Sequence, residues 1–279
     1  MYIFGCIRGD MLTTTPFSVS PNPAALYLTP SLRSALHKVR YTVDNRQGLT
    51  CVLGDAGMGK SSLMRLLHLE YEDHEDEVTI AFLTDPDFHT PNAFVRSICQ
   101  AFDVPMRRSL QAQKNQFKEF ILEQAQAGKN VILLLDESQG MDSETMEVLR
   151  SFLNFESNTA KLLQIVMAGQ LELRERLKMP RNKALKSRIV MYSLLSPLTP
   201  IEAKAMLQHR CQLSEIPIPF SDEVIDLIYA SCGGVPRDIL RICGYAYETA
   251  HIMGETDVSR ELAEQSIEHE RQVLEEEAA

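Results

Sequence analysis

The amino-acid sequence predicts an α/β fold, in which helices flank a parallel sheet and a small helical bundle follows. Short apolar runs typical of buried strands alternate with stretches of helical periodicity up to residue 194, and after Pro200 only helical periodicity remains. With 279 residues and 44% hydrophobic content, the chain can form one large domain or two modest ones. We expect an extended lead-in over residues 1–30, an α/β domain over 31–198, and a helical domain with an acidic tail over 199–279.

Five short apolar segments are expected to form the strands of the sheet. They lie at residues 49–53, 78–83, 131–135, 162–167 and 189–194. Helical segments lie at residues 31–43, 60–69, 91–102, 110–127 and 143–155, followed by a basic helical stretch from Leu171. This alternation predicts parallel strands, because a connection through a helix returns the chain to the same end of the sheet. Four more helices are expected at residues 201–213, 222–230, 236–250 and 259–275.

The most informative motif is GDAGMGKS at residues 54–61, which fills every fixed position of the pattern G-x-x-x-x-G-K-[ST]. Its glycines allow a close approach to phosphates, and the N-terminus of the following helix favours an anion. We therefore expect a nucleoside triphosphate here, with Lys60 on the β- and γ-phosphates and the Ser61 hydroxyl on Mg²⁺. The expected nucleotide contacts are Gly54, Asp55, Ala56, Gly57, Met58, Gly59, Lys60, Ser61, Ser62 and, from the lead-in, Tyr27.

A second motif follows the strand at 131–135, where Asp136 and Glu137 end the apolar run. In phosphate-loop proteins an aspartate at this place helps to hold Mg²⁺, and a glutamate beside it is placed to orient and deprotonate the attacking water. Glu137 therefore favours a hydrolase over a switch or a small-molecule kinase. The alternative is that the two acids only terminate a strand.

Three more side chains are candidates for contact with the γ-phosphate. Gln170 follows the strand at 162–167, and its amide can hydrogen-bond the phosphate or the water. Arg188 directly precedes the last strand and is our first choice for an arginine that completes a neighbouring subunit's site, with Arg181 second. Arg237 lies in the first turn of a bundle helix and can serve the phosphate of its own chain. The alternatives are a solvated helix face, a salt-bridged subunit surface, or plain surface arginines.

Charge and cysteine content limit the classes of partner and compartment. The net charge of −10 argues against a surface that attracts nucleic acid throughout, but residues 174–188 form a strongly basic stretch and residues 70–77 an acidic one. The six cysteines are scattered without zinc or disulfide spacing, so we expect reduced thiols in a cytoplasm. No apolar run approaches the roughly 20 residues that span a bilayer. Met1 and Met11 both stay open as the natural start.

These elements, in this order, resemble the AAA+ ATPases, and more narrowly the ExeA-like group, which includes transposition regulators of the TnsC and MuB type. The narrower resemblance covers about residues 14 to 250. It rests on the Pro-Phe and LYLTP sequences within residues 16–30, on DESQ at 136–139, on LLQIV and AGQLELR within 162–174, and on GVPR at 234–237.

The resemblance implies ATP and Mg²⁺ bound between subunits, a sheet in the order 5-1-4-3-2, and a homo-oligomeric ring or helical filament. It implies Lys60 and Ser61 in the first Walker motif, Asp136 and Glu137 in the second, Gln170 as first sensor, Arg188 as finger and Arg237 as second sensor. Gln170 departs from the Asn or Thr of many first sensors.

Three functions stay open at this point. The first is an ATPase that acts on duplex DNA with a transposase-type protein partner, and the second is a protein-directed ATPase of secretion or envelope assembly. The third is a switch that binds ATP and barely hydrolyses it. The membrane segment and peptidoglycan-binding domain of secretion-type relatives do not follow the bundle, and we take this to favour the first.

Overall fold

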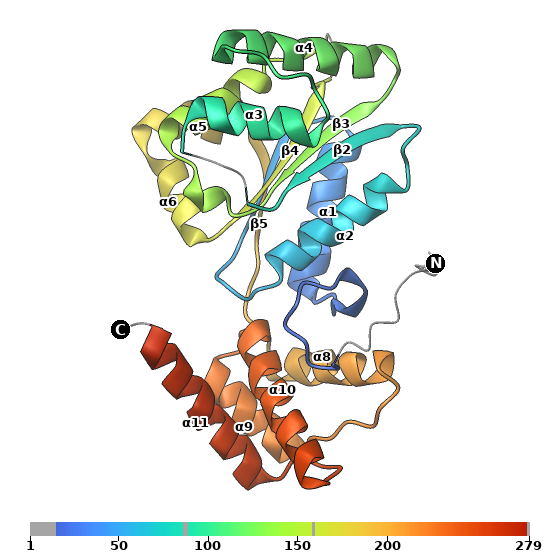
Figure 1. Cartoon of the computed structure of the whole chain (residues 1–279), viewed down its shortest axis with the longest axis vertical. Coiled ribbons are helices and arrows are strands. Elements are labelled where there is room, and N and C mark those ends of the chain that lie inside the picture. The colour runs from blue at the N-terminus through green and yellow to red at the C-terminus, as the bar shows by residue number, and fades with distance from the viewer. Residues whose placement is uncertain (1–14, 86–88, 158–159, 278–279) are drawn as a thin grey trace. The chain divides into compact units, whose positions relative to one another are not determined.

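The computed structural model describes residues 15–85, 89–157 and 160–277 (Figure 1). The chain divides into two compact units, an α/β unit over Pro21–Pro197 and a helical unit that combines Leu198–Ala279 with the first residues of the chain, through Ser20. The expected lead-in is therefore shared between the two units. The two candidate starts, Met1 and Met11, lie outside the described residues.

The α/β unit is built on one sheet of five parallel strands in the order β2-β3-β4-β1-β5, which confirms the order 5-1-4-3-2. The strands are β1 (Leu49–Leu53), β2 (Val78–Leu83), β3 (Asn130–Leu135), β4 (Leu163–Gly169) and β5 (Ile189–Leu194). Every residue of β1, β3 and β4 is buried, as in parallel sheets covered on both faces. The carboxyl ends of these three strands form one edge of the sheet.

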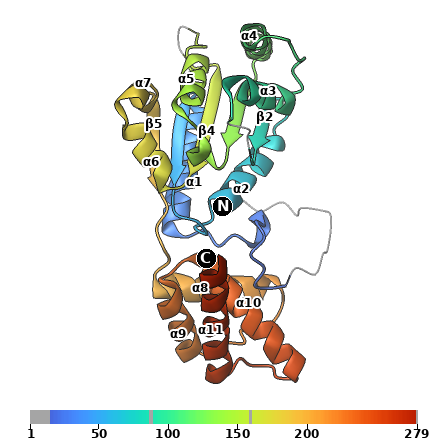
Figure 2. The same ribbon diagram turned by 60° about the vertical axis from the view of Figure 1, so that its left-hand side comes forward.

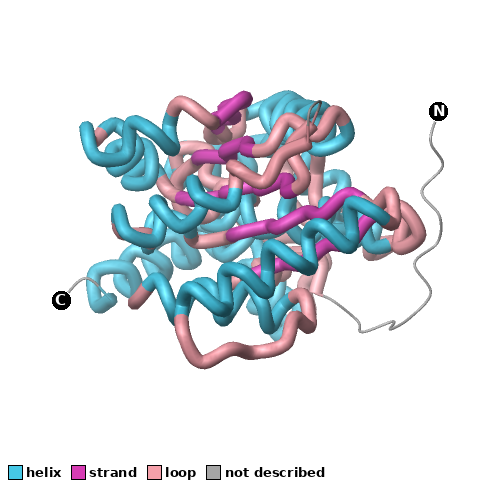
Figure 3. Tube along the Cα trace, turned by 90° about the horizontal axis from the view of Figure 1, so that it is seen from above, coloured by secondary structure: helices cyan, strands magenta, loops and turns pink. Residues whose placement is uncertain are grey.

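Helices cover both faces of the sheet (Figure 1, Figure 2 and, from above, Figure 3). One face carries α1 (Pro30–Asp44), which packs on β5 and β1, and α2 (Lys60–Glu72), which packs on β2. The other face carries α3 (Pro91–Ala101), α4 (Leu110–Gln126), α5 (Ser143–Phe152), α6 (Leu171–Lys178) and α7 (Lys183–Lys186). Short 3₁₀ turns complete the unit: η1 (Pro23–Ala25), η2 (Ser138–Gly140) and η3 (Pro180–Asn182).

The basic stretch from Leu171 is divided into α6, η3 and α7. The break falls at Pro180, which has no backbone N–H to continue the ladder of α6 and disfavours a helical conformation at the residue before it. Basic side chains of this stretch therefore point in more than one direction.

A cluster of phenylalanines holds the helices of the second face in place. Phe117 of α4 and Phe152 of α5 are fully buried, and their ring centroids lie 5.0 Å apart. Burial of an aromatic side chain of this size contributes about 1.5–3 kcal/mol. Because Phe152 ends α5, this contact fixes the C-terminal end of the helix against α4.

The helical unit contains α8 (Pro200–Leu213), α9 (Asp222–Cys232), α10 (Pro236–Met253) and α11 (Arg260–Glu277). Phe17 from the lead-in is buried in it, with its ring edge-on to Phe220 at 5.2 Å and to Tyr247 at 5.5 Å. Arg210 donates a hydrogen bond of 3.1 Å to the carbonyl oxygen of Ser18. None of the described helices combines the length and the apolar character that crossing a membrane requires.

Candidate nucleotide site

The loop between β1 and α2 has the backbone that its glycines allow. Gly57 and Gly59 have φ angles of 77° and 87°, in the left-handed region that side chains disfavour. Gly54 lies so close to the segment after β5 that a Cβ there would be 3.1 Å from the Cβ of Leu195. The loop therefore turns sharply and presents its backbone rather than side chains.

Helix α2 begins at Lys60 directly after this loop. The first N–H groups of a helix have no acceptor within it, and Gly59 at the N-cap has no side chain to supply one. The backbone N–H groups of Lys60, Ser61 and Ser62 thus lie at the positive end of the helix dipole, where an anion is favoured. Asp55 and Ala56 are exposed at the loop's tip, and Met58 is buried beneath it.

The side chain of Lys60 is 5% exposed and lies along the loop. Its Nζ donates hydrogen bonds of 2.7 Å to the carbonyl oxygen of Gly54 and 2.8 Å to that of Asp55. A buried ammonium requires compensating polar partners, and an anion at the loop would add full charge compensation. The position of Lys60 fits a triphosphate.

Asp136 directly follows β3 and is 3% exposed. Its carboxylate accepts a hydrogen bond of 2.9 Å from the N–H of Glu137, and the Ser61 hydroxyl also favours its charged form. Burial raises the pKa of Asp136 above its ordinary value, and these interactions and the charge of Lys60 only partly oppose the rise. The two side chains predicted to hold Mg²⁺ thus interact, and a cation held by them would relieve the cost of the buried carboxylate.

Glu137 follows with φ 48° and ψ 30°, an uncommon conformation for a residue with a side chain. Its carboxylate accepts a hydrogen bond from Nε2 of Gln139, and Oε1 of Gln139 accepts the backbone N–H of Gln170 at 3.0 Å. The structure therefore brings Glu137 and Gln170 together through one amide. Sequence reasoning assigned no role to Gln139, although an amide two residues after the glutamate is a usable signal.

The segment before α1 lies beside the loop. η1 contacts α2, and a Cβ on Gly59 would lie 3.7 Å from Cδ1 of Leu26. Tyr27, the next residue, is half-buried. Its contact with the nucleotide stays a prediction.

Arg188 lies at the opposite end of the sheet from the phosphate loop. Ile189, the first residue of β5, pairs with Leu49, the first residue of β1, whereas the loop follows the last residue of β1. A strand of five residues separates them by about 16 Å. Arg188 is near acids of its own chain: its charge adds to the lowering of the pKa of Glu147 by Arg150 and to that of Glu156 by Lys161.

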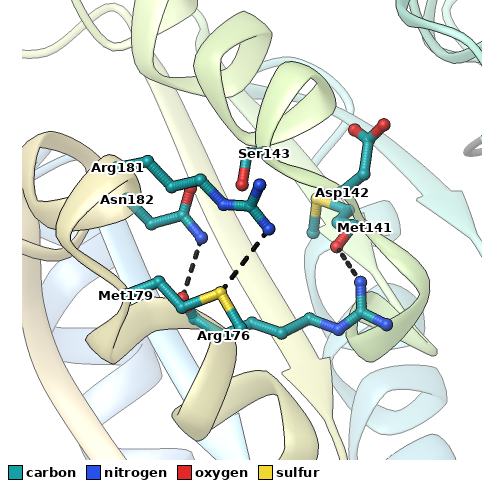
Figure 4. Close-up of a pocket in the computed structure, with 7 residues that line it drawn as sticks. All are labelled: Met141, Asp142, Ser143, Arg176, Met179, Arg181 and Asn182. Atoms are coloured by element: carbon teal, nitrogen blue, oxygen red, sulfur yellow. Dashed lines mark hydrogen bonds between the residues drawn. The ribbon is translucent and has the colours of Figure 1, made fainter.

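Arg181 lines a pocket of about 280 Å³ between η3 and the start of α5 (Figure 4). Its guanidinium points toward Ser143 and has Sδ of Met179 at 3.6 Å, while the neighbouring Arg176 donates to the carbonyl oxygen of Met141 at 2.9 Å.

Arg237 is exposed in the first turn of α10 and belongs to the helical unit. The roles predicted for Arg181 and Arg237 stay predictions.

A parallel sheet of this order, with a phosphate loop after β1 and an acidic pair after β3, defines a P-loop nucleoside triphosphatase fold. Residues 43–177 match the family model described as an AAA domain. The chain is 30% identical over 246 residues to General secretion pathway protein A of Aeromonas hydrophila. The match covers 87% of this chain and 44% of that protein, so this chain spans less than half of its relative. Together these two matches support an AAA+ ATPase of the ExeA-like group.

Solved structures share the fold. The Aeropyrum pernix ORC2 protein, in ADPNP-ADP complexes, has a TM-score of 0.67 at 16% identity over 91% of this chain and 71% of that one. Cdc6p of Pyrobaculum aerophilum has a TM-score of 0.68 at 16% identity over 90% and 69%. The Aeropyrum pernix ORC1 protein in complex with DNA has a TM-score of 0.66 at 17% identity over 90% and 68%. At this identity the likeness is one of fold.

Proposed function

We propose that this protein binds ATP with Mg²⁺ at the subunit interfaces of a homo-oligomer, hydrolyses it, and uses the nucleotide state to control assembly and action on duplex DNA. In this proposal it works in the cytoplasm with a transposase-type protein partner. The main support for ATPase activity is that Lys60, Ser61 and Asp136, from two separate segments of the chain, lie together at one site.

The chemistry follows from what these side chains hold. Bound Mg·ATP supplies the phosphoryl group and the charge that polarises it. The N–H groups of the loop and Lys60 would hold the phosphates, and the oxygens of Ser61 and Asp136 would hold the cation. Glu137 orients the attacking water and accepts its proton as the water oxygen bonds to the γ-phosphorus, while the bond from that phosphorus to the β–γ bridging oxygen breaks and ADP leaves. Gln170 donates its amide to the phosphate or the water.

The position of Arg188 supports assembly. An arginine about 16 Å from its own loop along the strand direction cannot reach its own phosphates, so it serves a site only in a neighbouring copy. Such an interface joins different surfaces of the two copies. Heterologous interfaces produce closed rings or open helical filaments.

Two observations support DNA as the partner. Lys183 and Lys186 are exposed on α7 and Arg174 on α6, within the basic stretch. A structural neighbour with the same fold, the Aeropyrum pernix ORC1 protein, is in complex with DNA. The observation that opposes it is the net charge of −10.

The second candidate is a protein-directed ATPase. It is favoured by the 30% identity to General secretion pathway protein A, of which this chain spans 44%. An ATP-dependent complex with a protein from the same cell and no response to duplex DNA at low salt would support this candidate over the first.

Replacement of Glu137 tests hydrolysis. We expect Glu137→Gln to lower the rate of ATP turnover by about 10² to 10⁴-fold while ATP binding is retained, because only the proton acceptor is lost. Glu144→Gln, at an exposed acid in the first turn of α5, is the matched control and should keep the wild-type rate. If Glu137→Gln turns over ATP like the wild type, the protein is not the proposed hydrolase.

The basic stretch is tested by the salt dependence of DNA binding. We expect ATP-dependent binding of a duplex, measured by fluorescence anisotropy, that weakens as salt rises because phosphate contacts release counterions. Lys183→Ala with Lys186→Ala should reduce the log–log salt slope by about 1.8. Lys114→Ala with Lys118→Ala on α4 is the control and should leave the slope unchanged. Absence of duplex binding at low salt would exclude the DNA-directed function.

A further inference from the structure

The side chain of Gln139 lies between two residues of the proposed reaction and contacts both. Gln139 is in η2, the 3₁₀ turn that follows Glu137. Its Nε2 donates to the Glu137 carboxylate, and its Oε1 accepts the N–H of Gln170 at 3.0 Å. Both ends of one rigid amide are therefore used, one toward the proposed base and one toward the backbone of the proposed γ-phosphate sensor.

The backbone around Gln139 is shaped to admit this side chain. A Cβ on Gly169 would lie 3.1 Å from Oε1 and 3.2 Å from the backbone N of Gln139, and 2.8 Å from Cδ2 of Leu173. A Cβ here would displace the end of the Leu173 side chain and would push the backbone of η2 away by a few tenths of an ångström. Gly169 is thus required for the close packing of η2 on the end of β4, which holds Gln139 in place.

The turn itself is firmly held. Ser138 is fully buried, and its Oγ donates a hydrogen bond of 3.2 Å to the carbonyl oxygen of Leu135 at the end of β3. The N–H of Gly140 bonds to the carbonyl oxygen of Glu137 at 3.0 Å. On this turn the side chains of Glu137 and Gln139 are bonded to each other, and Gln139 also accepts the N–H of Gln170.

The backbone conformation of Glu137 is a second reason why a hydrogen bond that holds its side chain is needed. Its left-handed φ of 48° costs free energy for a residue with a side chain, and such residues persist where their surroundings hold them. The orientation of the Glu137 carboxylate therefore depends on the side chains that are hydrogen-bonded to it. Gln139 is the side chain that the structure shows bonded to it.

We propose that Gln139 is the positioning residue of this site, which holds the Glu137 carboxylate and couples it to the position of Gln170. The amide has no proton acceptor of useful basicity, so it acts through Glu137. When the segment of Gly169 and Gln170 shifts with the γ-phosphate, the amide shifts with it and moves the carboxylate. This inference rests on the proposed hydrolysis. It explains how the presence of the γ-phosphate would affect the position of the Glu137 carboxylate, through Gln170 and Gln139.

Two substitutions of Gln139 test the proposal. Gln139→Glu keeps the size and the acceptor for Gln170 but replaces the donor to Glu137 by a second carboxylate, and Gln139→Ala removes both contacts. We expect each to lower kcat at least 10-fold while the Kd for ATP, measured with a fluorescent analogue, changes less than 2-fold. Gln111→Ala, at an exposed amide on α4, should change neither value.

The double variant with Glu137→Gln separates positioning from a general distortion. If Gln139 acts only through Glu137, single-turnover rates of Glu137→Gln and of Glu137→Gln with Gln139→Ala should agree within 2-fold. A further fall in rate, or a loss of ATP affinity in Gln139→Ala, indicates a structural role and overturns the proposal. Wild-type kcat in both Gln139 variants also overturns it. Wild-type turnover in Glu137→Gln would instead refute the hydrolase itself.

Discussion

The hydroxyl of Ser61 stabilises the charge of the Asp136 carboxylate, although Asp136 directly follows β3 and Ser61 lies in the first turn of α2. These are the two side chains expected to hold Mg²⁺. Without a cation the contact only partly offsets the burial of the carboxylate, because its pKa stays above the ordinary value of 3.8. If these residues hold Mg²⁺ as predicted, their arrangement in advance of the cation comes at the expense of stability.

We predict that Asp136→Asn stabilises the nucleotide-free protein at pH 7. A raised pKa in the folded state means that the folded protein holds the proton more tightly than the unfolded chain, so stability falls as the pH rises from 3.8 through the raised value. An uncharged amide avoids this loss. We expect a rise in Tm of about 2–4 °C by calorimetry, for a stabilisation of about 1 kcal/mol.

The same variant should lose its response to the cation. Addition of Mg²⁺ with ATP should raise the Tm of the wild type more than that of Asp136→Asn, because the negative ligand is gone. Near pH 4 the difference between the two nucleotide-free proteins should shrink. An unchanged Tm at pH 7 would contradict the assignment of Asp136 as a costly buried charge.

Mixing two inactive variants tests Arg188. We predict that Arg188→Ala lowers turnover by about 10³ to 10⁵-fold, as expected for loss of a trans arginine. Lys60→Ala should be inactive because it lacks the phosphate contact. A mixture should recover turnover, since a Lys60→Ala subunit still offers Arg188 to the intact loop of its neighbour. Arg181→Ala alone should retain turnover. No recovery in the mixture, or a loss confined to Arg181→Ala, would assign the role elsewhere.

Gly234 should tolerate no side chain. It has a φ of 84°, and a Cβ there would lie 2.3 Å from the carbonyl oxygen of Leu198. We predict that Gly234→Ala destabilises the protein by about 3 kcal/mol or more, measured by urea unfolding. Gly233 is a matched control, because its φ of 58° is also left-handed but nothing lies within 4 Å. Gly233→Ala should cost about 1–2 kcal/mol. Equal losses in the two variants would argue against the close approach.

Asp142 should stabilise α5 as its N-cap. Its side chain accepts the N–H of Thr145 at 2.8 Å. We predict that Asp142→Ala costs about 1 kcal/mol and Asp142→Asn only a few tenths, in thermal or urea unfolding. An Asp142→Ala protein as stable as the wild type would show that the cap is dispensable.

The same residue should show a defined pH dependence. Partial burial raises the pKa of Asp142, but hydrogen bonds to Thr145 and Glu144 and the charge of Arg176 outweigh it, and the pKa lies below 3.8. Stability from the charged form is then present above 3.8 and is lost as the pH falls through the lower folded value. The stability of Asp142→Asn relative to wild type should therefore improve as the pH falls below 4.

Much of the nucleotide site could be predicted from the sequence. The backbone of residues 54–61 follows from glycines at the positions with positive φ, and Lys60 opens α2 where helical periodicity begins. The strand order came with the resemblance rather than from periodicity, and the structure confirms it. The division of the lead-in was not predicted, because burial of Phe17 against Phe220 and Tyr247 depends on residues some 200 positions away.

The sequence by itself determined the phosphate loop, the acidic pair and the alternation of strands and helices, because each depends on neighbours along the chain. Only the tertiary structure decided that Gln139 bonds to both Glu137 and Gln170, and that Arg188 lies at the far end of the sheet from its own loop. These relationships depend on the register between strands. Pairing across the sheet sets which side chains meet, and residue type alone does not specify it.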